Sequence, residues 1–285
     1  VATSEVTHEK LINMMVGREL KNVFIKDAKQ TAQFDREEVL LEVKNLSREH
    51  EFQQVSFEVK RGEILGFFGL MGAGRTEVMD TVFGLHKPDA GTVKMKGSSV
   101  HSVKRAIANG MAYITEDRKI SGLNLIASVK DNITMTYMDL ILKAHFLLDF
   151  KKEKETAADL IEKLSIKCAS QNTLAGNLSG GNQQKIVIAK WFMGDPDLII
   201  MDEPTRGIDI GAKAEIYKLM DMFVKSGKSI IMISSETPEL LGMSDRVIVM
   251  HEGRVTGEFN RDELNQDELM AYAIGEGGKN QKAAG

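Results

Sequence analysis

Cysteine and long apolar runs are both scarce in this sequence. Among 285 residues there is one cysteine, Cys168. A lone cysteine rules out an internal disulfide and fits a reducing compartment. The longest apolar runs, such as 198–201 and 230–233, fall far short of the ~18–20 residues that a membrane span requires. They predict buried strands rather than a membrane-spanning helix.

An excess of charge of one sign is missing as well. The 37 Lys and Arg residues against 41 Asp and Glu residues give a net charge of −4. Proteins held mainly by DNA or anionic lipid carry a basic excess, so neither partner is indicated. The six histidines show no metal-ligand spacing, and no motif occurs twice. With 42% hydrophobic residues, the composition is that of a globular protein with one large domain or two small ones.

Strand and helix patterns alternate along most of the chain. Apolar and polar residues alternate over 39–43 and 55–59, as they do in half-buried strands. Short continuous apolar runs, typical of buried parallel strands, occur at 64–68, 112–115, 198–201, 229–234 and 246–250. Helices are predicted over 77–85, 128–148, 151–164, 183–192, 211–226 and 237–242. The alternation predicts an α/β fold with a mostly parallel core sheet, and the helical block at about 120–192 predicts a subdomain.

The two ends differ in composition from this body. Residues 1–38 are polar and charged, with a short apolar patch at 11–16, and we expect a linker or arm there. The first residue is Val1 and no signal peptide follows it, so we expect a fragment or a processed chain. Residues 276–285 are expected to form a flexible tail, which leaves 39–275 as the folded domain.

A glycine-rich loop follows the run at 64–68 and precedes a predicted helix. Its sequence, GLMGAGRT over 69–76, has the strand–loop–helix context of a phosphate-binding P-loop. Glycines let backbone N–H groups wrap phosphate oxygens, and a helix N-terminus favours an anion. A plain glycine-rich turn or a dinucleotide site stays open from this loop alone. The predicted nucleotide contacts are Gly69, Gly72, Ala73, Gly74, Arg75, Thr76 and Glu77, with Thr76 also a candidate Mg²⁺ ligand.

Two further motifs occur downstream of this loop. The run at 198–201 ends in two carboxylates, which predict Asp202 as a Mg²⁺ ligand and Glu203 as the general base that polarises the attacking water. Residues 178–185, LSGGNQQK, open a predicted helix and so form another anion-binding N-terminus, with Ser179, Gly180 and Gly181. Three such motifs in this order predict a nucleotide-binding protein.

The three motifs together resemble the nucleotide-binding domain of ABC transporters, almost continuously over 39–270. Residues 178–182 resemble the family's signature, written LSGGN instead of LSGGQ, and 206–209, RGID, take its D-loop position. The resemblance implies a P-loop NTPase fold of ABC type, with an antiparallel β segment and an inserted helical subdomain. It also implies ATP and Mg²⁺ as cofactors. It further implies a head-to-tail dimer in which Ser179, Gly180 and Gly181 contact ATP bound to the other domain.

Four segments narrow the resemblance to one subfamily, namely 69–77, 116–119, 178–185 and 202–209. They are similar to the C-terminal half of the tandem ATPase subunits of bacterial monosaccharide importers. The stretch 242–252, GMSDRVIVMHE, looks most like the ribose importers, with galactose and methyl-galactoside relatives next. The resemblance implies ATP hydrolysis coupled to sugar uptake at the cytoplasmic side of the membrane. The implied partners are the N-terminal domain of the same subunit, a sugar permease and, indirectly, a periplasmic sugar-binding protein, without nucleic acid.

Three positions depart from the family pattern. Arg75 stands where the P-loop has lysine, Glu116 where the Q-loop has glutamine, and Ser235 where a switch histidine is expected near the γ-phosphate. The planar fork of arginine does not replace a compact ammonium, and serine is short and uncharged. Glu116 remains a candidate Mg²⁺ ligand. We therefore expect an asymmetric pair, in which the signature completes the partner's site while this chain's own site is degenerate and the isolated domain weak or inactive.

Several alternatives stay open at the level of sequence. The chain also fits a non-catalytic regulatory half, or a soluble ABC ATPase acting on DNA or ribosomes, although the latter usually carries a coiled-coil insert or basic segments. Phe52 and His50 are both candidates for the residue that stacks on adenine. Met135 and Met138 either pack in the core or line a surface for a partner helix.

Overall fold

The computed structural model describes residues 34–144 and 146–277. The linker expected over 1–38 and the tail expected over 276–285 therefore lie almost wholly outside the described residues. The strands are β1 Val39–Arg48, β2 Phe52–Lys60, β3 Ile64–Phe68, β4 Ala90–Met95, β5 Ser98–Ser99, β6 Met111–Ile114, β7 Leu142–Lys143, β8 Leu147–Leu148, β9 Leu198–Asp202, β10 Ser229–Ile233, β11 Arg246–His251 and β12 Arg254–Asn260.

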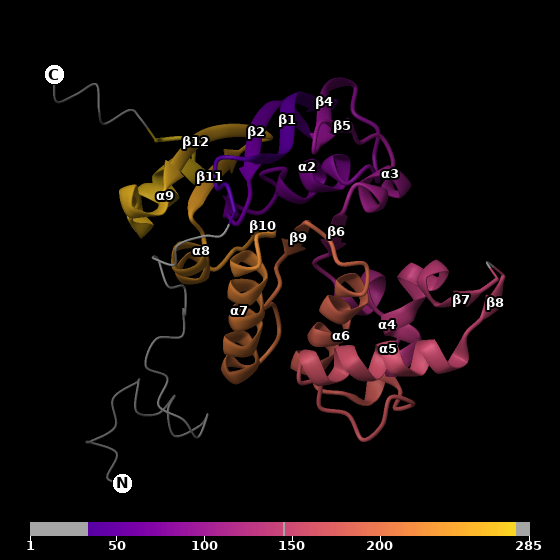
Figure 1. Ribbon diagram of the computed structural model, residues 1–285. Helices are drawn as coiled ribbons and strands as arrows, with labels where there is room; N and C mark the ends of the chain where they lie inside the picture. The colour runs from indigo at the N-terminus through magenta and orange to yellow at the C-terminus, as the bar shows by residue number, and fades with distance from the viewer. Residues whose placement is uncertain (1–33, 145, 278–285) are drawn as a thin grey trace, which may run out of the picture.

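Helices connect most of these strands, and Figure 1 labels the longer ones. The α-helices are α2 Arg75–Val82, α3 Val103–Ala108, α4 Val129–Thr134, α5 Phe150–Lys163, α6 Gly180–Phe192, α7 Ile210–Lys225, α8 Thr237–Met243 and α9 Gln266–Ala273. Short π or 3₁₀ turns are η2 Arg118–Gly122, η3 Met135–Ile141, η4 Ala175–Asn177 and η5 Arg261–Glu263. In the described part of the chain, none of the helices combines the length and apolarity that crossing a bilayer requires.

A six-stranded sheet in the order β12-β11-β3-β10-β9-β6 forms the centre of the molecule. Four of its five strand pairings are parallel, and the pairing of β11 with the edge strand β12 is antiparallel. Every residue of β3, β9 and β10 is buried, because helices and, on one side, the antiparallel sheet described below pack against this sheet. The predicted α/β fold with a mostly parallel core sheet is thus confirmed.

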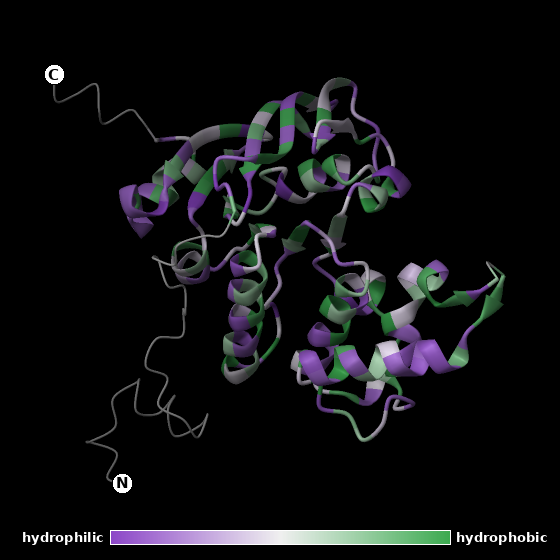
Figure 2. Ribbon diagram, viewed as in Figure 1, coloured by the Kyte–Doolittle hydropathy of each residue, from purple (hydrophilic) through white to green (hydrophobic). Residues whose placement is uncertain are grey.

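A second, antiparallel sheet in the order β2-β1-β4-β5 lies over one side of this core (Figure 1). Burial along β2 alternates, so that Val55, Phe57 and Val59 face the core while the residues between them face solvent. The same alternation of apolar and polar residues is visible along these strands in Figure 2. Helix α2 lies under this sheet and contacts β2, which places the start of α2 between the two sheets.

The helical block departs from the sequence prediction in one place. A single helix was expected over 128–148, but α4 ends at Thr134 and a 3₁₀ turn follows. Tyr137 interrupts that turn with φ −125° and ψ 48°, and its ring packs edge-on against Trp191 of α6. The chain then forms the β7–β8 hairpin instead of a helix. Tertiary packing of the tyrosine has overridden the local helical pattern.

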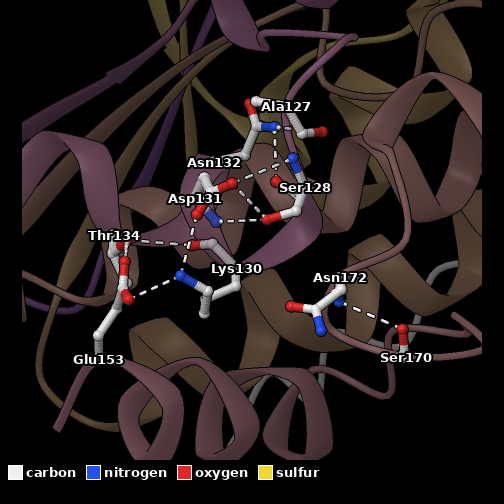
Figure 3. A network of polar contacts seen from close by, with 9 residues as sticks. All are labelled: Ala127, Ser128, Lys130, Asp131, Asn132, Thr134, Glu153, Ser170 and Asn172. Atoms are coloured by element: carbon white, nitrogen blue, oxygen red, sulfur yellow. Dashed lines mark hydrogen bonds and ion pairs between the residues drawn. The ribbon is translucent and has the colours of Figure 1, made fainter. Parts of the chain in front are cut away.

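Polar contacts fix the start of α4 (Figure 3). Ser128 and Asp131 form a reciprocal capping box, and the buried Asn132 side chain donates to the carbonyl oxygens of Asn124 and Ser128 at 2.9 Å each. Lys130 donates to the buried carboxylate of Glu153 on α5 at 2.6 Å. These bonds tie α4 to α5, which together with α6 make the helical block a body of its own at one side of the sheet.

Candidate nucleotide-binding site

The predicted P-loop lies between β3 and α2, at the edge where the parallel strands end. Gly72 and Gly74 have φ values of 80° and 90°, which glycine adopts without steric cost. A Cβ on Gly72 would meet no atom within 4 Å, so the space at this glycine is open. A Cβ on Gly74 would lie 3.1 Å from the carbonyl oxygen of Glu51, because the loop packs closely on the β1–β2 turn. The loop is therefore open at Gly72 and leads directly into the N-terminus of α2, where a helix favours an anion.

Thr76 and Asp202 meet beside this loop. The Thr76 hydroxyl donates to a carboxylate oxygen of Asp202 at 2.7 Å, although the residues are 126 positions apart. Thr76 lies in the first turn of α2 and Asp202 ends β9. Among the described residues no group of three or more His, Cys, Asp or Glu forms a metal cage. Mg²⁺ usually takes one or two protein carboxylates together with substrate phosphates, so this pair fits Mg²⁺ only alongside a bound nucleotide.

Burial alters the acidity of both carboxyl groups at the end of β9. It raises the pKa of Asp202 to about 6, against the hydrogen bond from Thr76 and with the help of the neighbouring negative Glu203. Burial also raises the pKa of Glu203, against hydrogen bonds from Ser235 and the positive charge of Arg75. A carboxyl with a raised pKa accepts a proton more readily, which suits a general base.

Glu203 has a constrained backbone. Its φ is 47°, in the left-handed region that a glutamate seldom occupies. The Glu203 N–H donates to Ile233 O at 2.9 Å, and the Ser235 N–H donates to its carboxylate at 2.8 Å. Ser235 therefore holds the carboxylate through its backbone, at the position where the family would place a histidine. Arg75 reaches across to the same segment, with Nη1 3.5 Å from Ser234 O.

Sequence reasoning missed a buried polar cluster next to these residues. Glu239 of α8 accepts from the Ser234 hydroxyl at 2.5 Å and from the Thr205 hydroxyl at 2.9 Å. Burial raises the pKa of Glu239, and the two hydroxyls oppose that shift. The cluster joins the residues that follow β9 and β10. In the sequence, only the acidic Glu239 within the short predicted helix 237–242 could have indicated this cluster.

The candidate ligand Glu116 follows β6 and is ion-paired with Arg206. Two residues further on, the Arg118 guanidinium donates to the carbonyl oxygens of Arg206 and Gly207. The structure thus brings the expected Q-loop and D-loop segments together, with the Glu116 carboxylate engaged by a guanidinium. From the sequence, Arg118 was identified only as part of the segment 116–119 and was assigned no role.

The signature residues lie at the start of α6, in the helical block, whereas α2 lies under the antiparallel sheet (Figure 1). Ser179 is exposed, and its hydroxyl accepts from the Asn182 side chain at 2.9 Å. A Cβ on Gly181 would lie 2.5 Å from that of Ala212 on α7, so this glycine permits close packing of the two helices. The two glycine-rich helix starts therefore belong to different parts of the molecule.

The two candidates for adenine stacking differ in exposure. Phe52 is 1% exposed and belongs to the core, which argues against its ring as the stacking group. His50 is exposed at the β1–β2 turn, next to the turn residue Glu51 on which the P-loop packs. A shallow hollow of about 560 Å³ opens nearby, between residues that include Arg48, Gln53 and Arg254.

Met135 and Met138 are both exposed, at 44% and 49%. Of the two readings left open by the sequence, core packing is wrong for these residues. Further apolar side chains are exposed in the same block, namely Leu140, Phe146, Leu147 and Phe150. Exposed apolar side chains therefore occur on η3, on the β7–β8 hairpin and at the start of α5.

Comparison with known proteins agrees with this geometry. A family model described as "ABC transporter" matches residues 52–206. A putative ribose/galactose/methyl galactoside import ATP-binding protein of Geobacillus kaustophilus is 50% identical over 274 residues, 95% of this chain and 53% of that protein. A ribose import ATP-binding protein of Caldanaerobacter subterraneus is 46% identical over 274 residues, 95% of this chain and 54% of that protein. The chain spans about half the length of the curated relatives it matches.

Solved structures share the fold. A nucleotide-free ATP-binding cassette from an ABC transporter superposes with a TM-score of 0.69 at 21% identity, covering 84% of this chain and 100% of that one. A dimeric cassette in a post-hydrolysis state, bound to ADP and Pi, gives a TM-score of 0.67 at 19% identity, with 78% of this chain and 99% of that one covered. At these identities the match establishes the architecture of a P-loop ATPase cassette.

Proposed function

This chain belongs to the ABC transporter family of ATP-binding proteins, and from that premise we propose that it is the C-terminal nucleotide-binding domain of a sugar importer's ATPase subunit. The observation that carries the proposal is the match, at 50% identity, to only about half of a ribose/galactose-type import protein. A subunit twice this length has room for a second such domain. Ribose is the proposed sugar class, because several relatives are named as ribose import proteins.

The chemistry of the site follows from its own side chains. Gly72 leaves open space beside the loop, Gly74 lets the loop pack on the β1–β2 turn, and the start of α2 would attract the charge of the phosphates. Thr76 and Asp202 would hold Mg²⁺, which neutralises charge on the β- and γ-phosphates when bound. Glu203, held by the Ser235 N–H, would orient the attacking water and accept its proton.

The arrangement also supports an asymmetric pair of sites. Ser179, Gly180 and Gly181 lie at the start of α6, where Ser179 is exposed, Gly180 is half-buried and Gly181 is buried. We propose that this helix start contacts ATP bound to the opposing domain. This chain's own loop carries Arg75 in place of lysine, and its Glu116 is engaged by Arg206. We therefore propose that the signature serves the competent site and that the local site turns over slowly.

The apolar surface around Met135 and Met138 is the proposed contact with a membrane permease. Methionine suits such a surface because its flexible side chain adapts to a partner. Attachment through this surface would place the chain on the cytoplasmic side of the membrane. Binding and hydrolysis of ATP would then drive the permease between its two access states.

The test compares ATP hydrolysis by this chain alone and by the two-domain subunit. We expect little turnover by the isolated chain and a loss of about 100-fold in the subunit on Ser179→Arg, as when a positioned donor to a reacting group is removed. Ser98→Arg, at an exposed serine of β5, is the matched control. Substantial turnover by the isolated chain, or a subunit indifferent to Ser179→Arg, would overturn the proposal.

A non-catalytic regulatory half is the second candidate, favoured by the departures at Arg75, Glu116 and Ser235. It binds ATP and lends its signature but hydrolyses nothing. ATP binding by the subunit without any turnover, after the P-loop of the other domain is disabled, would support it. Residual turnover in that variant would favour the slow site instead.

A further inference from the structure

Arg118 joins three segments that are far apart in the sequence. It begins the η2 turn after β6, and its side chain crosses to the segment that follows β9. Nη1 donates to Arg206 O at 2.7 Å and Nη2 to Gly207 O at 3.2 Å. One guanidinium thus holds two consecutive carbonyl groups of the segment 206–209, which takes the D-loop position.

The same guanidinium lies against the start of α6. A Cβ on Gly180 would lie 2.9 Å from Arg118 Nη2 and 3.2 Å from Gly207 O. The missing side chain of Gly180 therefore leaves the space in which Arg118 and Gly207 meet the signature helix. Arg118, Gly180 and Gly207 form a junction of three segments, which we call the signature junction.

Two features of Arg118 lower stability. Its Nε is buried and has no hydrogen-bond partner among the described residues, and an unpaired buried donor is costly. Its positive charge lies at the N-terminus of a helix, where the helix dipole disfavours a cation. Groups that keep such costs are candidates for a functional role.

We propose that Arg118 is a positioning residue for the opposing domain's nucleotide site. By holding the 206–209 segment against the start of α6, it makes the signature and the D-loop segment move as one rigid unit. Ser179 then meets the opposing nucleotide in a fixed orientation relative to that segment. Glu116, ion-paired with Arg206, braces the same segment from the preceding turn. This role rests on the proposed function, because it requires a second nucleotide-binding domain.

The experiment uses the two-domain subunit with Arg118→Ala, Arg118→Lys and, as the matched control, Lys119→Ala at the neighbouring exposed residue. Arg118→Ala removes both hydrogen bonds from the guanidinium, and we expect it to lower kcat for ATP about tenfold or more, since one hydrogen bond from a charged group accounts for about that factor. KM is expected to change little, because ATP first binds the P-loop of the other domain. Lysine can donate to one carbonyl group but not to both in the forked geometry, so Arg118→Lys recovers part of kcat. Lys119→Ala leaves kcat and KM unchanged.

Two outcomes overturn this role. One is an unchanged kcat in Arg118→Ala; the other is a loss of kcat that follows a lowered melting temperature and disappears when the assay is cooled. ATP binding by this chain alone gives a second measurement, and Arg118→Ala should leave it intact because the P-loop is on another part of the molecule. Ser179→Arg separates the two proposals. If Ser179→Arg abolishes turnover while Arg118→Ala leaves kcat unchanged, only the positioning role of Arg118 is contradicted. If Ser179→Arg has no effect, the proposed function itself is contradicted.

Discussion

At the scale of single residues, the site concentrates groups whose environment is costly. Glu203 keeps a left-handed φ of 47° that is held by bonds to Ile233 and Ser235. Asp202 keeps a carboxyl group with a pKa raised to about 6 by burial. Such strain and desolvation persist where the surrounding structure over-determines the geometry, and they are typical of reactive sites.

Glu63 offers a test of buried charge outside the site. Burial raises its pKa to about 7, partly opposed by Arg246 and by the Lys60 N–H. The folded protein therefore holds this proton more tightly than the unfolded chain does. The stabilising effect is complete below pH 4.5 and is lost as the pH rises to about 7. The stability of the wild type relative to Glu63→Gln should fall across this window by up to about 3 kcal/mol.

Urea unfolding at several pH values measures this difference. Glu258→Gln removes the exposed carboxylate that contacts the same Arg246, and serves as the control. Glu258→Gln should change the free energy of unfolding by no more than about 1 kcal/mol, as is usual for exposed ion pairs. If the free energies of unfolding of the wild type and of Glu63→Gln changed with pH in parallel, the raised pKa of Glu63 would be contradicted.

At the scale of elements, periodicity predicted most strands and helices because their patterns are local. The buried runs became β3, β6, β9, β10 and β11, each within a residue or two of the expected bounds. The prediction missed β4, β12, α3 and α9, and it was wrong at 128–148, where the helix ends at Thr134. No local pattern predicts that Tyr137 packs on Trp191, since the two residues are far apart in the chain.

The capping box of α4 should carry a measurable part of the stability of the helical block. Ser128→Ala removes the bonds between the Ser128 hydroxyl, the Asp131 N–H and the Asp131 carboxylate. Loss of such a cap costs about 1 kcal/mol. Thermal or urea unfolding of the chain gives the value. Ser98→Ala, at an exposed serine of β5, should change stability by less than about 0.5 kcal/mol.

At the scale of the whole molecule, the P-loop and the signature belong to different parts of the fold. The P-loop lies between the two sheets, whereas the signature opens α6 in the helical block (Figure 1). This separation is what a head-to-tail pair of domains would use. We therefore expect a substitution in the P-loop and a substitution in the signature to affect ATP turnover independently of each other.

In the proposed two-domain subunit, Thr76→Ala removes the proposed local Mg²⁺ ligand and Ser179→Arg places a bulky charged side chain at the proposed signature. If the local site is the slow one, Thr76→Ala lowers ATP turnover far less than Ser179→Arg does. Steady-state ATP hydrolysis by the two variants measures the ratio. Equal losses would show that both sites contribute alike, against the asymmetric pair.

The sequence alone determined the α/β class and located the P-loop, the paired carboxylates and the signature. These features depend on residues that are neighbours in the chain, and their backbone geometry is local. The tertiary structure decided what long-range pairing controls. In the structure Phe52 is buried, whereas Met135 and Met138 are exposed. The Arg118 side chain donates to the carbonyl groups of Arg206 and Gly207, which are 88 and 89 positions away in the chain. Strand order and helix packing create those contacts, so no pattern read along one segment contains them.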